Sequence, residues 1–119
     1  EILEYYSPRA EKKQQGLVYR VREHLDTIFL AHGLTSRGVA KHFETEERTL
    51  RNRFRAEFNL TLRNYFTALR LRYATDLMRS KKLPVRDVYY LAGYNDESTF
   101  RYELRKYGLS NQRATQRLP

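Results

Sequence analysis

The chain has 119 residues, of which 23 are Lys or Arg and 14 are Asp or Glu, so its formal net charge is +9 at pH 7. It contains no cysteine, which excludes a disulfide framework and a thiolate metal site and suits a cytoplasmic protein. No run of residues approaches the roughly 18 apolar residues of a membrane span, and no signal peptide is visible, so we expect no membrane association.

The positive charge belongs to one part of the chain. Residues 1–34 contain five basic and five acidic residues, whereas residues 35–119 contain 18 basic and nine acidic residues. A module this basic most often binds nucleic acid, and less often an acidic membrane or protein partner. The alternative is a basic surface that serves only solubility.

The predicted elements, taken in chain order, are all helices. Residues 1–16 are polar and are expected to form a linker or disordered lead-in, and Glu1 in place of Met fits a fragment that lacks an upstream sensor or dimerisation domain. Apolar spacing and stop signals then predict helices over 17–29, 36–43, 46–58, 62–81, 84–92 and 96–107, with a last short piece after Ser110. No alternating strand pattern occurs, so the expected fold is all-α with about seven helices.

The helix expected from Leu62 to Lys81 has apolar residues on two sides. One stripe contains Leu62, Tyr65, Phe66, Leu69, Tyr73 and Leu77, and the other contains Leu71, Ala74 and Met78. Two stripes mean that the helix is covered twice, so we expect a small lobe on either side of it. Its 20 residues would span about 30 Å, close to one turn of duplex DNA at about 34 Å.

The segments on either side of this helix repeat one layout with an offset of 50 positions. The apolar side contains Leu50, Phe54 and Phe58 in the first copy and Phe100 and Leu104 in the second. The opposite side contains Arg48, Arg51, Asn52 and Arg55 in the first copy and Ser98, Arg101, Tyr102 and Arg105 in the second. A short helix, headed by Val39 or Val88, precedes each copy. This is the helix-turn-helix arrangement.

The exposed side of each copy offers the donors that DNA recognition needs. Arg can reach guanine O6 and N7 with two hydrogen bonds, and an Asn amide can pair with adenine N6 and N7. A solvated basic helix would explain one such segment equally well. Two copies at matched spacing favour double-stranded DNA as the partner.

Three groups of residues then point to a family. Ala40, Phe43, Arg48-Thr49-Leu50 and Phe54 resemble the first helix-turn-helix of the AraC family of bacterial transcription regulators. Arg70-Leu71, Ala74, Leu77 and Met78 are similar to its linker helix. Val88, Gly93-Tyr94, Ser98 and Phe100 resemble its second helix-turn-helix, and Tyr107-Gly108 its closing motif.

The resemblance covers roughly residues 17–116 and implies a DNA-binding domain at 17–119. Its parts would be a first homeodomain-like lobe at 17–58, a linker helix at 61–81 and a second lobe at 84–116. It also implies two recognition helices in successive major grooves of an asymmetric promoter site. The implied activity is regulation of transcription, usually activation through contact with RNA polymerase, by a cytoplasmic, nucleoid-associated protein.

Several positions depart from the family pattern. Glu46 replaces a capping Ser, Asn52 and Tyr102 replace frequent Arg residues, Tyr89 replaces a small Ala, and Asn111 replaces a Pro. These differences leave the fold expectation intact. They leave open whether the second lobe reads bases or mainly holds phosphates.

The resemblance assigns roles by position. The candidates for base contact are Arg48, Arg51 and Asn52 in the first lobe and Glu97, Ser98, Arg101 and Tyr102 in the second. The candidates for phosphate contact are Arg55, Arg63, Arg105 and Lys106. Glu97 could accept a hydrogen bond from cytosine N4, but it is interpreted first as an acidic residue that complements the helix dipole.

Other chemistries find little support. Ten tyrosines could stack on RNA bases, but Tyr65, Tyr73 and Tyr107 fall on helical core stripes. The three histidines form no metal-binding pattern, and no pair of nucleophile and base is apparent, so we expect no metal, cofactor or enzyme activity. The alternatives to a sequence-specific regulator are a non-specific RNA- or DNA-binding module and a protein-interaction domain that has lost DNA reading.

Overall fold

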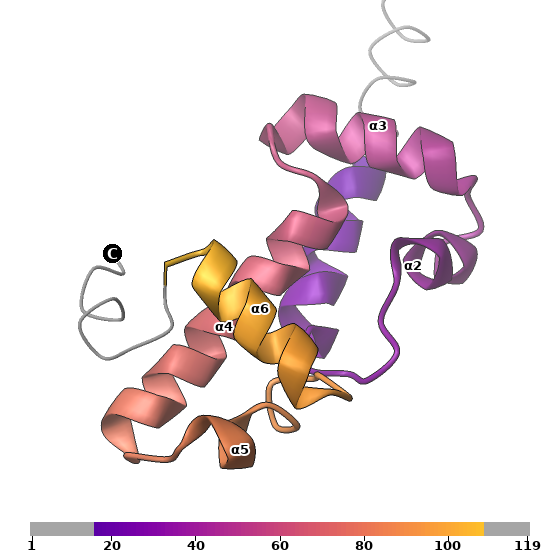
Figure 1. Ribbon diagram of the computed structural model, residues 1–119. Helices are drawn as coiled ribbons and strands as arrows, with labels where there is room; N and C mark the ends of the chain where they lie inside the picture. The colour runs from indigo at the N-terminus through magenta and orange to yellow at the C-terminus, as the bar shows by residue number, and fades with distance from the viewer. Residues whose placement is uncertain (1–15, 109–119) are drawn as a thin grey trace, which may run out of the picture. The chain divides into compact units, whose positions relative to one another are not determined.

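The computed structural model describes residues 16–108, and all regular structure in this range is helical (Figure 1). Helical residues 16–28 come first, followed by α2 (Ser36–His42), α3 (Glu47–Phe58), α4 (Leu62–Ser80), α5 (Val85–Val88) and α6 (Glu97–Lys106). The all-α prediction is confirmed. The expected lead-in and the helical piece after Ser110 lie outside the described residues, apart from residue 16, which is helical.

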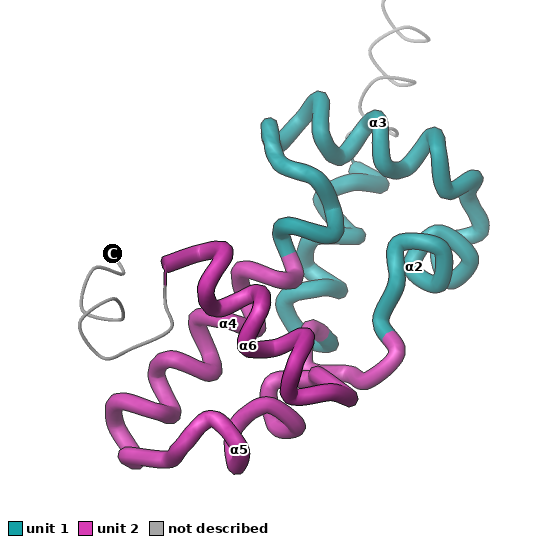
Figure 2. Tube along the Cα trace, in the orientation of Figure 1, with its two compact units in different colours: residues 1–28, 34–65 teal, residues 29–33, 66–119 magenta. Residues whose placement is uncertain are grey.

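The described chain divides into two compact units (Figure 2). Residues 16–28 and 34–65 belong to unit 1, and residues 29–33 and 66–108 belong to unit 2. α4 begins in unit 1 and continues in unit 2. The chain therefore enters unit 2 for five residues between its first helix and α2 before it reaches the main part of that unit.

Unit 1 has an apolar core that all four of its helical segments supply. The buried side chains are Val18, Val21 and Leu25 from the first helix, Val39 and Ala40 from α2, Leu50 and Phe54 from α3, and Leu62 from α4. Local signals set the helix ends. The Thr35 hydroxyl caps α2 by accepting the N–H of Gly38 at 3.0 Å, and Asn59 ends α3 in the left-handed conformation.

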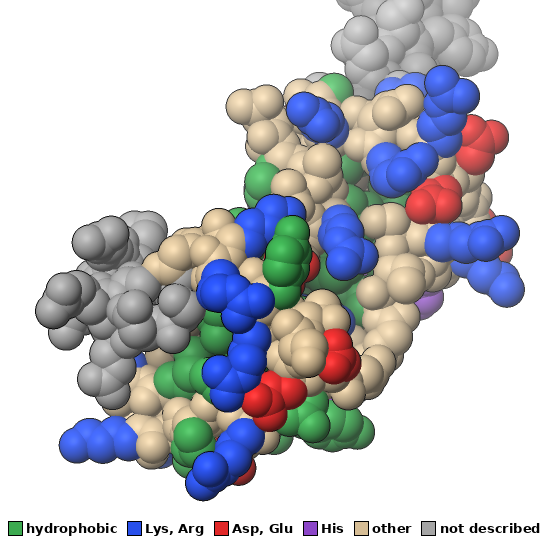
Figure 3. Space-filling view, viewed as in Figure 1, with side chains coloured by type: hydrophobic (Ala, Val, Ile, Leu, Met, Phe, Trp, Pro, Cys, Tyr) green, Lys and Arg blue, Asp and Glu red, His purple; other side chains and the backbone are tan. Residues whose placement is uncertain are grey.

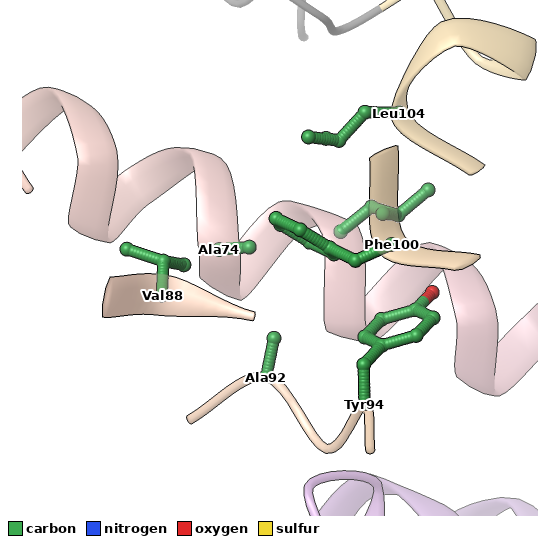
Figure 4. Packing of buried hydrophobic residues seen from close by; sticks show 7 residues of the cluster. Ala74, Val88, Ala92, Tyr94, Phe100 and Leu104 are labelled. Atoms are coloured by element: carbon green, nitrogen blue, oxygen red, sulfur yellow. The ribbon is translucent and has the colours of Figure 1, made fainter. Parts of the chain in front are cut away.

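Unit 2 has a separate core, shown in Figure 4. Its buried members are Leu71 and Ala74 from α4, Val88 from α5, Ala92 and Tyr94 from the following turn, and Phe100 and Leu104 from α6. Tyr89, which replaces the small residue of the family pattern, is partly buried and packs against this cluster. The larger side chain is thus accommodated at the edge of the core.

α5 is shorter than the sequence predicts. It spans Val85–Val88 with Pro84 as its N-cap, whereas the apolar pattern predicts a helix from 84 to Ala92. Residues 89–93 form a turn in which the N–H of Tyr94 donates to the carbonyl of Tyr89 at 3.1 Å. The regular helix is lost because these N–H groups change partner: Gly93 donates to the carbonyl of Tyr90, three residues back, and Tyr94 to a carbonyl five residues back. Gly93, with φ +93°, then closes the turn at the end of the predicted helix.

A buried arginine fixes residues 29–33 in unit 2. The side chain of Arg70 donates from Nε to the carbonyl of Phe29 at 2.6 Å and from Nη2 to the carbonyl of Ala31 at 2.7 Å. Its guanidinium also faces the rings of Phe66 and Tyr94, with centroids 5.2 and 5.5 Å away. Charge-assisted bonds of this kind are stronger than neutral ones, so Arg70 holds this loop by its main chain.

Candidate nucleic-acid interface

α3 presents the two sides that its spacing predicts. Leu50 and Phe54 are fully buried, and Phe58 is half-buried with its ring centroid 4.7 Å from that of Phe54. The predicted reading side is exposed along the whole helix; it contains Arg48, Arg51, Asn52 and Arg55. The apolar contacts thus orient the donors outward. Their contact with DNA stays a prediction.

α6 repeats this arrangement in unit 2. Phe100 and Leu104 are buried, whereas Ser98, Arg101, Tyr102 and Arg105 are exposed. Tyr102 has 56% of its surface exposed. Its ring is therefore available as a contact surface. Glu97 is half-buried at the start of the helix.

α6 begins at a well-formed cap. The carboxylate of Asp96, which precedes the first helical residue, accepts the N–H groups of Ser98 and Thr99 at 3.3 and 2.9 Å. The Thr99 hydroxyl also donates to this carboxylate. This bond is the largest cause that lowers the pKa of Asp96, and the bond from the Thr99 amide is the second. At α3 the equivalent residue is Glu46, whose side chain makes no cap hydrogen bond.

Each reading helix contains an ion pair that the sequence analysis misses. In α6 the Nε of Arg101 lies 2.7 Å from an Oε of Glu97, and in α3 the Nε of Arg51 lies 3.9 Å from an Oε of Glu47. The two pairs occupy equivalent positions in the repeat. An acidic residue four positions before an Arg is the available signal. The Glu97 carboxylate thus pairs with Arg101, while Asp96 caps the helix.

The phosphate-contact candidates are exposed. Arg55 lies on α3, Arg63 in the first turn of α4, and Arg105 and Lys106 in the last turn of α6. Each unit taken by itself shows this in Figure 3: Lys and Arg side chains lie over α3 in unit 1 and over α6 in unit 2, with a few Asp and Glu side chains among them.

A cleft in unit 1 adds two cations that the sequence analysis misses. It has a volume of about 530 Å³ and is lined by Arg37, Ala40, Lys41, Thr45 and Glu47. Arg37 and Lys41 lie four positions apart on α2, are exposed, and share the lining of this cleft with Glu47, the first residue of α3. Their spacing in the sequence is the signal that could have found them.

The tyrosine prediction is wrong at one position. Tyr65 and Tyr73 are half-buried, but Tyr107 is 38% exposed. Tyr107 is the C-cap of α6, so it lies beyond the last helical residue and leaves the buried stripe. Among residues 16–108 the exposed aromatic surface therefore includes Tyr102 and Tyr107 as well as Tyr90.

The histidines make local contacts. The rings of His24 and His42 stack with centroids 4.4 Å apart, and desolvation followed by the proximity of His42 lowers the pKa of His24. The His32 ring nitrogens lie 2.6 Å from an oxygen of Asn95 and 2.8 Å from the carbonyl of Tyr90. No group of three or more His, Asp or Glu side chains within 16–108 could hold a metal ion.

None of the helices in the described part of the chain has the length and apolar character needed to cross a membrane.

Comparisons with known proteins agree with this geometry. A family model described as a helix-turn-helix domain matches residues 39–110, more than half of the chain. Among solved structures, the chain is similar to the C-terminal domain of AraT, a response regulator from Geobacillus stearothermophilus. The two chains share 22% identity over 84% of this chain and 83% of that one, with a TM-score of 0.76. A search of curated proteins finds no match.

Proposed function

Since the chain belongs to the AraC-type helix-turn-helix family of DNA-binding transcription regulators, we propose that it recognises one specific duplex sequence with α3 and α6. The observation that carries this proposal is the repeat itself. Two helices bury the same side and expose donors at equivalent positions 50 residues apart. A surface that served only solubility would need no such repetition.

The side chains of α3 suit direct reading of bases. Arg48 and Arg51 each carry a planar set of donors that matches guanine O6 and N7, and the Asn52 amide matches adenine N6 and N7. In α6, Arg101 offers the same fork, Ser98 a hydroxyl, and Tyr102 an apolar ring that can contact a thymine methyl group. Both helices thus carry groups that distinguish base pairs in the major groove.

A second set of cations would hold the DNA backbone. It contains the predicted Arg55, Arg63, Arg105 and Lys106, to which the α2 cleft adds Arg37 and Lys41. Phosphate contacts fix register and orientation and carry no direct sequence information. These residues would therefore supply affinity, whereas the base-contact residues of α3 and α6 supply sequence specificity.

We propose further that α3 and α6 occupy successive major grooves of an asymmetric site. Two reading helices in one chain bind two different half-sites, so the site need not be palindromic. Their centres would lie about 10 base pairs apart. Following the family resemblance, we propose activation through contact with RNA polymerase at the bacterial nucleoid, controlled by a sensor domain outside this sequence.

Selection from a random duplex library near physiological salt tests the function. Two short motifs about 10 base pairs apart and unlike each other are the expected result. A single motif would show that only one helix reads bases, and α6 would then only hold the backbone. Binding without sequence preference that collapses as salt rises would replace the proposal by non-specific phosphate attraction.

Two variants separate reading from holding. Arg51→Ala is expected to cost about 1–3 kcal/mol on the selected duplex and to relax the preference at one base pair. Arg105→Ala is expected to weaken binding to selected and scrambled duplexes alike and to reduce the salt slope by about 1. Equal losses on both duplexes for Arg51→Ala would refute its role in reading.

A further inference from the structure

We propose that Glu97 is a positioning residue that makes Arg101 a guanine reader, so that α6 reads sequence as well as holding the backbone. The inference rests on the proposed DNA-binding function and deepens it by assigning the base and the residue that sets its choice. It follows from the geometry of one ion pair on the reading face of α6.

The ion pair occupies one edge of the guanidinium. The Nε–H of Arg101 donates to the Glu97 carboxylate at 2.7 Å. A guanidinium carries five N–H donors in a rigid plane, so the two terminal nitrogens, Nη1 and Nη2, keep their donors. Within residues 16–108 the structure shows no other partner for Arg101. The terminal edge is the one that can bond guanine O6 and N7 together.

Glu97 is free for this task because another residue caps the helix. Asp96 already accepts the N–H groups of Ser98 and Thr99. The Glu97 carboxylate lies instead along the helix at Arg101, four positions on, in the orientation that favours such pairs. Both side chains remain partly open to solvent, with exposed fractions of 51% for Arg101 and 36% for Glu97. The pair is therefore accessible to DNA.

The pair changes what Arg101 gains from DNA. An unpaired arginine on a DNA-facing helix is drawn to the nearest phosphate, which is the same for every sequence. The Glu97 charge offsets that attraction and repels phosphate, but it leaves the donor pattern of the terminal edge intact. Only a base with two suitably placed acceptors then compensates Arg101 for its lost hydration. Glu97 thus lowers the affinity for DNA of any sequence and raises the preference for guanine over other bases.

α3 supplies a matched comparison. Its equivalent pair has an Nε to Oε distance of 3.9 Å, too long for a hydrogen bond. The exposed fractions, 56% for Arg51 and 37% for Glu47, are close to those of the α6 pair. The two pairs therefore differ mainly in hydrogen bonding. Glu47→Gln is the control for the charge effect without the orienting bond.

The experiment measures dissociation constants for the selected duplex and its single-base variants at several salt concentrations. The proteins are the full chain, Glu97→Ala, Glu97→Gln, Arg101→Lys and Glu47→Gln. We expect the full chain to prefer guanine at one position of the half-site that α6 contacts. Glu97→Ala should lose roughly tenfold of this preference and steepen the salt slope by about 0.9, because Arg101 becomes available to a phosphate.

The other variants test the mechanism. Glu97→Gln should steepen the slope similarly but recover part of the preference, because its amide oxygen still accepts the Nε–H. Arg101→Lys should lose the guanine preference while it keeps its affinity for scrambled DNA, because an ammonium retains the charge without the planar fork. Glu47→Gln should leave the guanine preference in the α6 half-site unchanged.

Three results would overturn the proposal. An unchanged preference and slope in Glu97→Ala would make Glu97 a helix charge only. A lost preference for cytosine at another position would make it a base reader itself. Guanine preference lost equally in Glu97→Ala and Glu97→Gln, with the total helix content by circular dichroism unchanged, would show that the Nε–H hydrogen bond does not orient Arg101. Absence of any sequence preference in the full chain would instead refute the proposed function.

Discussion

At the scale of single residues, two glycines differ in what surrounds them. Gly93 has φ +93°, and a Cβ at this position would lie 2.9 Å from Nε of Arg70 and 3.0 Å from the carbonyl oxygen of Leu30. Gly33 also has a positive φ, +78°, but a Cβ there would meet nothing within 4 Å. A residue with a Cβ would therefore strain the backbone at both positions, whereas it would clash with neighbouring atoms only at Gly93.

Alanine at each position separates these two effects. Gly33→Ala should lower the free energy of unfolding by about 1 kcal/mol through backbone strain alone. Gly93→Ala should cost more than about 2 kcal/mol, because Arg70 must also move away from the carbonyls that it holds. Urea unfolding measures both. Equal losses would show that the Arg70 environment adapts without cost.

Tyr65 should show an abnormal titration. Two effects raise the pKa of Tyr65 to about 12: burial is the larger, and the hydrogen bond that its hydroxyl donates to Asp26 is the second. The folded protein therefore keeps this proton above the ordinary pKa of 10.0. The stabilisation that the contact provides is present below pH 10 and is lost as the pH rises toward 12. Absorbance at 295 nm should record a late tyrosine that is missing in Tyr65→Phe; its persistence in that variant would contradict the assignment.

At the scale of elements, α6 depends on an acidic cap. The Thr99 hydroxyl and amide hold the pKa of Asp96 below its ordinary value of 3.8. The ionised cap therefore stabilises α6 above that value, and its contribution is lost as the pH falls through the lower, folded-state pKa. We expect the protection of the Ser98 and Thr99 amides, measured against the intrinsic exchange rate at each pH, to fall in acid in the wild-type protein.

Asp96→Asn is the control for this prediction. Asn caps helices about as well as Asp but does not titrate in this range. Its acid sensitivity at these two amides should therefore be smaller. An equal loss of protection in the variant would assign the effect to another carboxylate.

The helices and their faces were predictable because their signals are local. Caps such as Thr35 and Asp96 and the apolar spacing of Leu50 and Phe54 act within one or two turns. The early end of α5 at Val88 was not predictable, because residues 89–92 keep helix-like hydrogen bonds, such as that from the N–H of Ala92 to the carbonyl of Val88, and so share the apolar spacing of a helix. The pairing of Glu97 with Arg101 was also missed, since it depends on a choice of side-chain rotamer.

The site was predictable as a pattern and less so in detail. Every residue assigned to the two reading sides by spacing is exposed or half-buried at the expected place. Arg37 and Lys41 were missed because a cleft between α2 and the start of α3 depends on tertiary packing. Sequence spacing defines the face of one helix, but it does not show what an adjacent helix adds to that face.

At the scale of the whole molecule, two separate cores predict two separable responses. Phe54 and Phe100 are both fully buried, in unit 1 and unit 2 respectively. Replacing either by Ala should cost about 3–5 kcal/mol. We expect Phe100→Ala to lower amide protection in α5 and α6 and Phe54→Ala to lower it in α2 and α3. Uniform loss of protection in either variant would show that the chain unfolds as one cooperative unit.

The loop 29–33 also limits how genes for such domains can recombine. A crossover between α3 and α4 would transfer Arg70 and leave behind the carbonyls of Phe29 and Ala31 that it holds. The hybrid would survive only where the resident loop follows the same path and places two carbonyl oxygens at the buried guanidinium. Because these partners belong to the main chain, most side chains of the loop could differ between parents. A functional hybrid therefore needs a loop with the same backbone path, whatever its amino-acid sequence.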